Sequence, residues 1–390
     1  MVTVEDEYIN PAVSGDNFYL TIDKGYQFIL EDELKKGVEE YGAVSGTGII
    51  MNPNTGEVLA LANIDDFNPN EYWKYNDFQR RNRALTDTYE PGSTFKSFTI
   101  ASLIDQKLCR LNEKLYLEHG KYKYQNVNIK DTHPFNSLNV VEIIEQSSNI
   151  GVAKLVQRID DEKYFKYLRG FGFGNSTSLT LPGETAGRLR KPTEWSKVSK
   201  VYLSFGYEIS VTPLQLLTGY CALINGGILY EPQLVQRQIS VDGNLVYEFN
   251  PKEIRRVISA ETSDIMRDLL RGVVKNGTGE KAYSEFISVG GKTGTSQKFV
   301  DGSYSKQHYN SSFIGFFPAE NPQVICLILL NSPDQGKYGG LVAAPIFKNV
   351  AERIVQTDVE KYQEYLNPDL MKNLKFAENN SENQIKNKST

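Results

Sequence analysis

Strand-like segments occur near both ends of this 390-residue chain, and a long helical stretch separates them. Residues 46–63 hold two β-like runs around Asn-Pro-Asn-Thr-Gly, which is typical of a hairpin. Three more apolar runs cover 286–296, 311–318 and 323–332 and are joined by short polar connections. The most economical arrangement pairs both groups in one antiparallel sheet. The middle of the chain then forms an inserted second lobe, with a cleft between the two.

Helical spacing of apolar residues fills most of the remaining chain. It predicts helices over 22–41, 253–275 and 341–355, and it dominates from 93 to about 250. Residues 63–90 are polar and aromatic without a clean period, so they are predicted to be irregular.

The predicted fold class is therefore α/β, an antiparallel sheet flanked by helices plus an all-helical lobe. The sheet lobe is expected from about 18–62 and 276–356, and the helical lobe from about 93–275. Within that lobe, residues 106–136 receive no assignment; they could line the cleft or form plain surface.

The two ends of the chain are polar. Residues 1–17 contain Pro11 and Gly15 as breaks and lack the basic-then-apolar layout of a secretion signal. Either the protein is cytoplasmic or the chain is a soluble piece of a longer one, and we favour the second. Residues 357–390 are rich in Asn, Lys and Glu and are predicted to form a solvated, flexible tail.

Composition argues against several classes of protein. A net charge of −5 disfavours a nucleic-acid or anionic-membrane partner held by bulk charge, and no window of about 18 apolar residues predicts a membrane span. Of three widely spaced cysteines, Cys221 and Cys326 lie in apolar runs, so buried thiols are predicted and a disulfide framework is not. The three histidines share no metal-site spacing, and no G-x-S-x-G elbow supports a Ser-His-Asp hydrolase.

The first candidate for chemistry is Ser93 with Lys96, directly after Pro-Gly and at the start of an apolar helical run. At this spacing the two side chains share one helix face, and the serine lies among the free N–H groups of the first turn. A nucleophile there gains help for its oxyanion, and a buried lysine of lowered pKa could take its proton. Ser-x-x-Lys alone is a weak signal. Ser303 and Lys306 match it too and are interpreted as a solvent-facing loop.

Ser147-x-Asn149 is the second candidate, with a hydroxyl to relay a proton and an amide to hold a substrate backbone. This pattern is weaker still. The pair at 137 and 139 also matches and resembles a helix N-terminus, and the pair at 381 and 383 falls in the predicted tail.

The third candidate is Lys292-Thr293-Gly294-Thr295, on a strand-like run preceded by two glycines. An edge strand without a side chain at Gly294 lets a peptide pair alongside it, and the neighbouring hydroxyls can bind a terminal carboxylate. A phosphate loop is disfavoured because Phe286 stands where its first glycine belongs and no helix follows.

The three motifs occur in the order found in penicillin-binding proteins and class A β-lactamases. Over roughly residues 17–355 the chain resembles the transpeptidase domain of a class B (monofunctional) penicillin-binding protein, and the segment SFGYEISVTPLQL favours the division (septal) type. Other segments similar to the family, in family order, are LTIDKGYQFILEDEL, GIIMNPNTGEVLALAN, LPGETAGRL, SSFIGFFPAENPQV and YGGLVAAPIFKNV.

The resemblance implies the penicillin-binding transpeptidase or serine β-lactamase-like fold, with the active site in the cleft between the lobes. It implies that Ser93 is the nucleophile, Lys96 its base and Ser147 a proton relay. Asn149 would hold the donor peptide, and Lys292 would supply positive potential and help the relay.

The resemblance also implies a site for the end of the peptide. Thr293 and Thr295 would bind the terminal carboxylate, with Gly294 allowing close approach. The backbone N–H groups of Ser93 and Thr295 would form the oxyanion hole. No metal or cofactor is implied.

The reaction implied by the resemblance is acyl transfer in peptidoglycan synthesis. A D-Ala-D-Ala stem peptide would acylate the serine, and an amine from a neighbouring stem would then form the cross-link; β-lactams would mimic the donor. By analogy, the chain is an extracytoplasmic domain of a protein anchored in the plasma membrane. Residues 1–17 would then be the linker remnant of a missing N-terminal pedestal, and residues 18–356 the transpeptidase domain. A glycosyltransferase and division proteins would be partners of the full-length protein.

Three alternatives keep the same fold. A serine β-lactamase or D,D-carboxypeptidase would deacylate with water, but the Glu-x-x-Leu-Asn string of class A enzymes is absent. A β-lactam sensor needs a membrane relay, which this chain lacks. A non-catalytic scaffold need not keep all three motifs.

Overall fold

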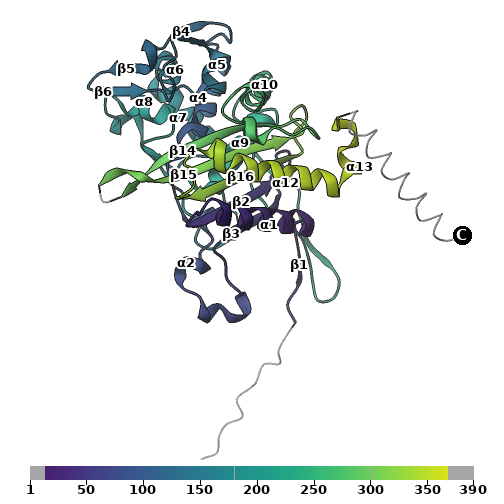
Figure 1. The fold of residues 1–390 in the computed structure, drawn as a ribbon. Helices are drawn as coiled ribbons and strands as arrows, with labels where there is room; N and C mark the ends of the chain where they lie inside the picture. Colours follow the sequence, from purple (N-terminus) through teal and green to yellow (C-terminus); the bar gives the residue numbers. More distant parts are fainter. Residues whose placement is uncertain (1–13, 180, 301, 368–390) are drawn as a thin grey trace, which may run out of the picture.

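An antiparallel five-stranded sheet forms the centre of the molecule (Figure 1). The computed structural model describes residues 14–179, 181–300 and 302–367. The sheet has the strand order β14-β15-β16-β2-β3, so the two β groups that are distant in sequence share one sheet, as predicted. Its strands are β14 (Gly290–Val300), β15 (Ser303–Phe317), β16 (Val324–Asn331), β2 (Ser45–Met51) and β3 (Val58–Ile64).

Strand β16 joins the N-terminal and C-terminal parts of the sheet. It pairs with β15 on one side and with β2 on the other, where Cys326 lies opposite Ile50. Nearly all of its residues are buried, as expected for a continuous apolar strand covered on both faces. Cys221 and Cys326 are buried free thiols, as predicted.

Two helices cover one face of the sheet. Helix α1 (Lys24–Glu40) begins at Asp23, whose carboxylate accepts hydrogen bonds from the first free backbone N–H groups. Helix α12 (Ala344–Thr357) packs beside it. Leu30, Leu34 and Phe347 are fully buried in the apolar cluster between these helices and the sheet. The helices predicted over 22–41 and 341–355 are thus confirmed.

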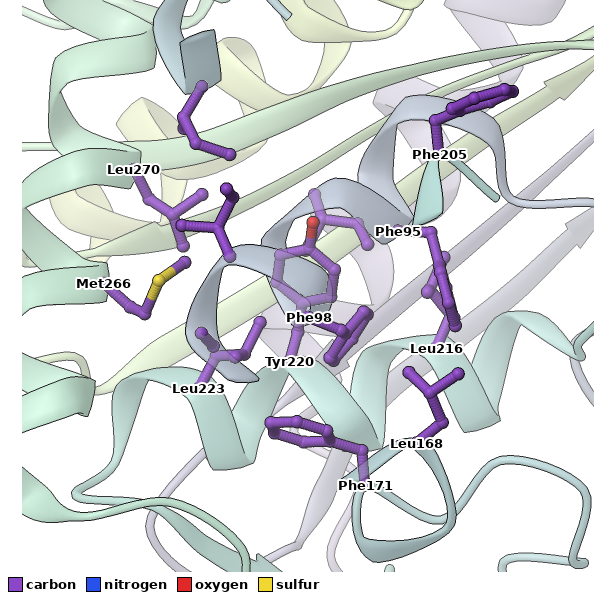
Figure 2. Packing of buried hydrophobic residues seen from close by; sticks show 14 of the residues in the cluster. Phe95, Phe98, Leu168, Phe171, Phe205, Leu216, Tyr220, Leu223, Met266 and Leu270 are labelled. Carbon is purple, nitrogen blue, oxygen red and sulfur yellow. The ribbon is translucent and has the colours of Figure 1, made fainter. Parts of the chain in front are cut away.

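A larger apolar cluster fills the opposite side of the sheet (Figure 2). Helix α9 (Pro213–Ile224) is buried at every residue, and the helices α4 (Lys96–Asp105) and α10 (Ala260–Asn276) pack near it. Phe98 of α4 makes edge contacts with Phe171 and Tyr220, at ring-centroid distances of 4.9 and 5.0 Å. This packing fixes α4, and with it the residues at its N-terminal end.

The second lobe is mainly helical, but the prediction that it is all helical is wrong. One short hairpin lies in the segment 106–136, and a second strand pair joins this segment to the residues directly after it. The hairpin residues, KYKYQNVNIK, alternate between exposed and less exposed side chains with a period of two, which the helical interpretation passed over. The lobe contains α5 (Val140–Glu145), α6 (Asn149–Leu155), α7 (Asp161–Gly170), α8 (Ser199–Ser204), and the pairs β4 (Lys114–Tyr116) with β7 (Ser137–Asn139) and β5 (Lys121–Tyr124) with β6 (Val127–Lys130).

Residues 228–256 form strands, so the prediction of helical spacing to about 250 is wrong there. The helix predicted from 253 starts instead after Ser259, whose hydroxyl caps it. The strand β1 (Asn17–Leu20) pairs with β11 in a separate small sheet and does not join the central one. The other strands are β8 (Arg188–Leu189), β9 (Ile209–Ser210), β10 (Ile228–Tyr230), β11 (Val235–Ile239), β12 (Leu245–Glu248) and β13 (Glu253–Arg256).

Short elements complete the fold. The predicted irregular segment 63–90 begins with the last two residues of β3 and holds the short helical elements η1 (Pro69–Lys74), α2 (Asp77–Arg80) and α3 (Arg83–Thr86). The second Ser-x-x-Lys match begins strand β15 and is exposed; the loop predicted for it is wrong because this part of the chain extends the β14–β15 hairpin.

The predicted tail is ordered at its start. Helix α13 (Val359–Tyr362) and a 3-10 turn (Gln363–Tyr365) continue past 357, while residues from 368 on, including the match at 381 and 383, lie outside the described residues. Across the described ranges, no helix combines the length and apolarity needed to cross a membrane.

Candidate active site

Ser93 lies in a 3-10 turn, η2 (Gly92–Phe95), which runs directly into α4. Gly92 has a φ of +57°, and its N–H donates to the carbonyl of Gly206 at 3.1 Å. A side chain at Gly92 would come within 2.8 Å of the Thr295 carbonyl oxygen. Because glycine removes that clash, the turn that carries Ser93 can press against strand β14.

Lys96 is fully buried one turn into the same segment. Its Nζ donates to the backbone carbonyl of Ser147 and, at 3.1 Å, to the Ser147 hydroxyl. Burial lowers the pKa of Lys96 to about 7, although the nearby charge of Asp131 opposes the shift. Near neutral pH a large share of Lys96 is therefore an uncharged amine that can accept a proton.

Lys292 reaches the same hydroxyl from strand β14. It too is fully buried, and its Nζ donates to Ser147 Oγ at 3.0 Å. Burial, together with the neighbouring charge of Lys96, holds the pKa of Lys292 well below its ordinary value. Ser147 Oγ thus joins two lysines that cannot easily be charged at the same time.

Ser147 occupies the turn between α5 and α6 and has a φ of +57°, in the left-handed region. Its backbone N–H donates to Ile144 O at 3.2 Å. Asn149, the first residue of α6, donates from its side-chain amide to Lys130 O at 2.9 Å. The weak Ser-x-Asn match at 137 and 139 instead forms a helix N-terminus, as predicted, with Asn139 capping α5.

Asp131 holds this turn in place, and the sequence analysis missed it. Its carboxylate accepts from the Asn149 N–H at 2.6 Å, the Ile150 N–H at 3.0 Å and the Ser148 hydroxyl at 2.6 Å. A carboxylate at the N-terminus of α6 also suits the helix dipole. Asp131 lies 17 residues before Ser148 in the sequence, so no local pattern connects the two.

Thr293 and Thr295 present their hydroxyls from β14, the edge strand of the sheet. Thr293 Oγ1 shares a 2.8 Å hydrogen bond with Thr278 Oγ1, and Thr295 Oγ1 accepts from the Gly339 N–H at 3.0 Å. Gly339 begins the short helix α11 (Gly339–Val342).

Gly294 is required for a reason that differs from the one predicted. A Cβ atom there would lie 2.4 Å from Ser312 Oγ and 2.8 Å from Thr94 Cγ2. The space left by the missing side chain is therefore filled by the protein itself. It lets the turn carrying Ser93 lie on β14, rather than admitting a peptide.

One cleft of about 630 Å³ collects the predicted residues that reach its surface, namely Ser93, Ser147, Asn149, Thr293 and Thr295. Lys96 and Lys292 lie fully buried beneath Ser147. The cleft runs between β14 and the helical lobe, which lie side by side in Figure 1. Other residues that line it and that the sequence analysis did not single out include Thr132, His133, Phe205, Tyr207, Thr278, Glu280, Lys281 and Tyr338.

This arrangement is suited to acyl transfer at a serine. It offers a hydroxyl at the start of a helix, a neutral amine near it, a second amine linked through a hydroxyl, and an edge strand for a peptide. Among the described residues, no three His, Cys, Asp or Glu side chains gather in a way that would hold a metal ion.

Comparison with known families agrees with this geometry. The model of the penicillin binding protein transpeptidase domain matches residues 46–352. The chain is 36% identical over 339 residues to a probable peptidoglycan D,D-transpeptidase, PenA, of Neisseria meningitidis, covering 86% of this chain and 56% of the relative. It is 35% identical over 352 residues to the stage V sporulation protein D of Bacillus subtilis, covering 88% and 54%. The chain therefore belongs to the penicillin-binding protein transpeptidase family, and it spans little more than half the length of these relatives.

Solved structures extend the agreement to the fold. Penicillin-binding protein 3 of Mycobacterium tuberculosis, complexed with aztreonam, superposes with a TM-score of 0.85 at 30% identity, over 93% of this chain and 83% of that one. The transpeptidase domain of penicillin-binding protein 3 from Burkholderia pseudomallei gives 0.77 at 30% identity, over 87% and 96%. The predicted family and the α/β transpeptidase fold are thus confirmed, apart from the strands within the helical lobe.

Proposed function

We propose that the chain is a peptidoglycan D,D-transpeptidase domain, which cross-links stem peptides through an acyl-enzyme at Ser93. The observation that carries the proposal is the meeting of two buried lysines at one hydroxyl. Lys96 and Lys292 donate to Ser147 Oγ at 3.1 and 3.0 Å, beneath a cleft that Ser93 lines. Buried amines of lowered pKa, joined by a hydroxyl, can move a proton without a histidine.

In the first half-reaction, Ser93 Oγ attacks the carbonyl carbon of the penultimate D-Ala while neutral Lys96 takes the hydroxyl proton. The backbone N–H groups of Ser93 and Thr295 stabilise the oxyanion. The proton then passes through Ser147 to the nitrogen of the leaving D-Ala, and Lys292 supplies positive potential to this relay. The peptide bond breaks and an ester to Ser93 remains.

The donor peptide is bound between strand β14 and the turn that carries Ser147 and Asn149, which line opposite walls of the cleft. The donor peptide lies along the edge of β14 by backbone pairing. The hydroxyls of Thr293 and Thr295 bind its terminal carboxylate, and the Asn149 side chain holds its backbone from the other wall. Support comes from the cleft, which both threonines and Asn149 line.

In the second half-reaction an amine of a neighbouring stem attacks the ester, and Ser93 recovers its proton. β-Lactams acylate the same serine because their ring imitates the donor. The M. tuberculosis relative has been solved with aztreonam and with ampicillin.

We also propose that this domain belongs to a longer protein and lies outside the cytoplasm, with a membrane anchor and a pedestal before it. A glycosyltransferase and division proteins are its proposed partners, and the division type is proposed over the elongation type. Support comes from relatives of greater length, including PenA and a sporulation protein.

Intact-protein mass tests the proposal directly. After incubation with benzylpenicillin over hours, the wild type is expected to carry one drug mass and Ser93→Ala none. A wild-type adduct that vanishes within seconds while drug is consumed would indicate a β-lactamase. No adduct, together with no turnover of a D-Ala-D-Ala peptide, would contradict the proposal.

A further inference from the structure

Glu280 and Lys281 lie side by side at one end of the cleft, on the 3-10 turn η6 (Glu280–Ala282). Both side chains are exposed. Sixteen ion pairs occur elsewhere among the described residues, but neither Glu280 nor Lys281 takes part in one or in a side-chain hydrogen bond. They are also the sole carboxylate and the sole lysine among the residues that line the cleft.

The pair lies at the Thr293 end of the cleft. Thr278, two residues before Glu280, shares a hydrogen bond of 2.8 Å with Thr293. At the other end, the N–H of Gln297 on β14 donates to the hydroxyl of Tyr207 at 3.5 Å. The turn that carries Ser93 packs against Thr295, so the nucleophile stands between these two ends.

The proposed function gives the Thr293 end a specific task. With the donor carboxylate at the hydroxyls of Thr293 and Thr295, the residue that leaves must occupy this end. The attacking amine must enter the space that the leaving residue vacates, because attack on the ester is the reverse of leaving-group departure. The leaving D-Ala carries its amine and a carboxylate on one carbon.

We propose that Glu280 and Lys281 select an acceptor whose amine stands beside a carboxylate, as in diaminopimelate, over one with a lone amine, as in lysine. This inference rests on the proposed function. The Lys281 ammonium adds its charge to the hydroxyls of Thr293 and Thr295 in binding the acceptor carboxylate, and the Glu280 carboxylate attracts the acceptor in its ammonium form. Two neighbouring charges of opposite sign match the two charges of such an acceptor.

The chemical step itself is balanced without a further reactant. The acceptor ammonium first releases one proton to solvent. The neutral amine then attacks the Ser93 ester carbon, the new C–N bond forms, and the C–O bond to Ser93 breaks. The second amine proton returns to Ser93 Oγ through Lys96, leaving an amide and a free serine.

The expected discrimination is modest because both side chains are exposed. Surface ion pairs are weak and are screened by salt. We expect Lys281 to contribute about fivefold to the preference at low ionic strength, which corresponds to the strength of one exposed ion pair, and to contribute less at 0.5 M salt.

A partition assay tests the inference. The enzyme is acylated with a thioester donor peptide, whose leaving group is not D-Ala, and the acyl group is shared between water and an added acceptor. D-Alanine and D-alanine amide form a matched pair that differs in the carboxylate, and they are compared at equal concentrations of free amine. The ratio of aminolysis to hydrolysis is measured for wild type, Lys281→Met, Glu280→Gln and the control Lys275→Met, an exposed lysine of α10 outside the cleft lining.

The wild type and Lys275→Met are expected to favour D-alanine, and Lys281→Met to reduce that preference about fivefold. Glu280→Gln is expected to weaken the apparent affinity for both amines. Equal use of the two acceptors by the wild type, or a preference that is undiminished in Lys281→Met, would overturn the inference. Failure of the thioester to acylate Ser93 at all would instead contradict the proposed function, so the two failures are distinguishable.

Discussion

Buried ionisable side chains have different partners on the two faces of the central sheet. Between α1 and α12, Glu33 is 6% exposed and is bonded by Lys36, Arg353 and Asn349. Burial alone would raise the pKa of Glu33, but these bonds hold it below its ordinary value. Under the cleft, Lys96 and Lys292 are fully buried, and neither forms an ion pair among the described residues.

This difference distinguishes Glu33, whose charge stabilises the fold, from Lys96 and Lys292, which can take part in proton transfer. A buried carboxylate surrounded by cations stays ionised and ties two helices together. Burial lowers the pKa of both Lys96 and Lys292, which bond to oxygens of Ser147 and to no carboxylate, so both lose a proton more easily than an ordinary lysine and can exchange protons. Four substitutions test this contrast.

Lys96→Met is expected to reduce the rate of acylation by benzylpenicillin about 1,000-fold, because it removes the base near Ser93. The free energy of unfolding should stay equal or rise by about 1 kcal/mol, since an apolar side chain replaces a buried amine. The acylation rate is measured by intact-protein mass after quenching at successive times, and the free energy of unfolding by urea denaturation. A variant that acylates at the wild-type rate would remove Lys96 from the mechanism.

Ser147→Ala is expected to slow acylation about 100-fold, because both lysines lose the hydroxyl that joins them. The comparison is with Ser303→Ala, which removes the serine of the second Ser-x-x-Lys match on the exposed part of β15 and should leave the rate unchanged. Similar rates for the two variants would contradict a relay through Ser147.

Asp131→Asn is expected to slow acylation about tenfold and to lower the unfolding temperature by a few degrees, because three hydrogen bonds to the α6 turn weaken. If Asp131 had a purely structural role, these two effects would be the only ones. The charge of Asp131 also raises the pKa of Lys96, so the midpoint of the pH–rate profile should move to lower pH in this variant. An unshifted midpoint would limit Asp131 to a structural role.

Glu33→Gln is expected to leave the acylation rate unchanged and to lower the free energy of unfolding by about 1–2 kcal/mol. The sign follows from its lowered pKa. The ionised form is favoured in the folded state, so its contribution is present above the unfolded pKa and is lost as pH falls through the folded one. Urea denaturation at pH 7 and pH 4 should show the wild-type advantage shrinking in acid.

Much of this arrangement could be predicted from the sequence. Long apolar runs predicted β2, β3 and β14 to β16, and the order of three short motifs predicted which residues line the cleft. The hairpin within 106–136 left an alternating pattern, but its strands are only four residues long and the helical interpretation passed over them. The role of Asp131 could not be predicted, because a contact across 17 residues leaves no periodic signal.

The role of Gly294 could be predicted only in part from the sequence. The sequence indicates that a side chain must be absent, but it does not say which neighbour fills the space. Only the packing of Thr94 and Ser312 against β14 reveals that the neighbour is the protein itself.

The pH dependence of acylation tests the central claim most directly. Lys96 must be neutral to accept the Ser93 proton, and its pKa is lowered to about 7. The second-order rate constant for acylation by benzylpenicillin, measured by intact mass from pH 5.5 to 9, should rise through about pH 7 and level off above it. A rate that is flat across this range, or that rises only above pH 9 as for an ordinary lysine, would contradict the account.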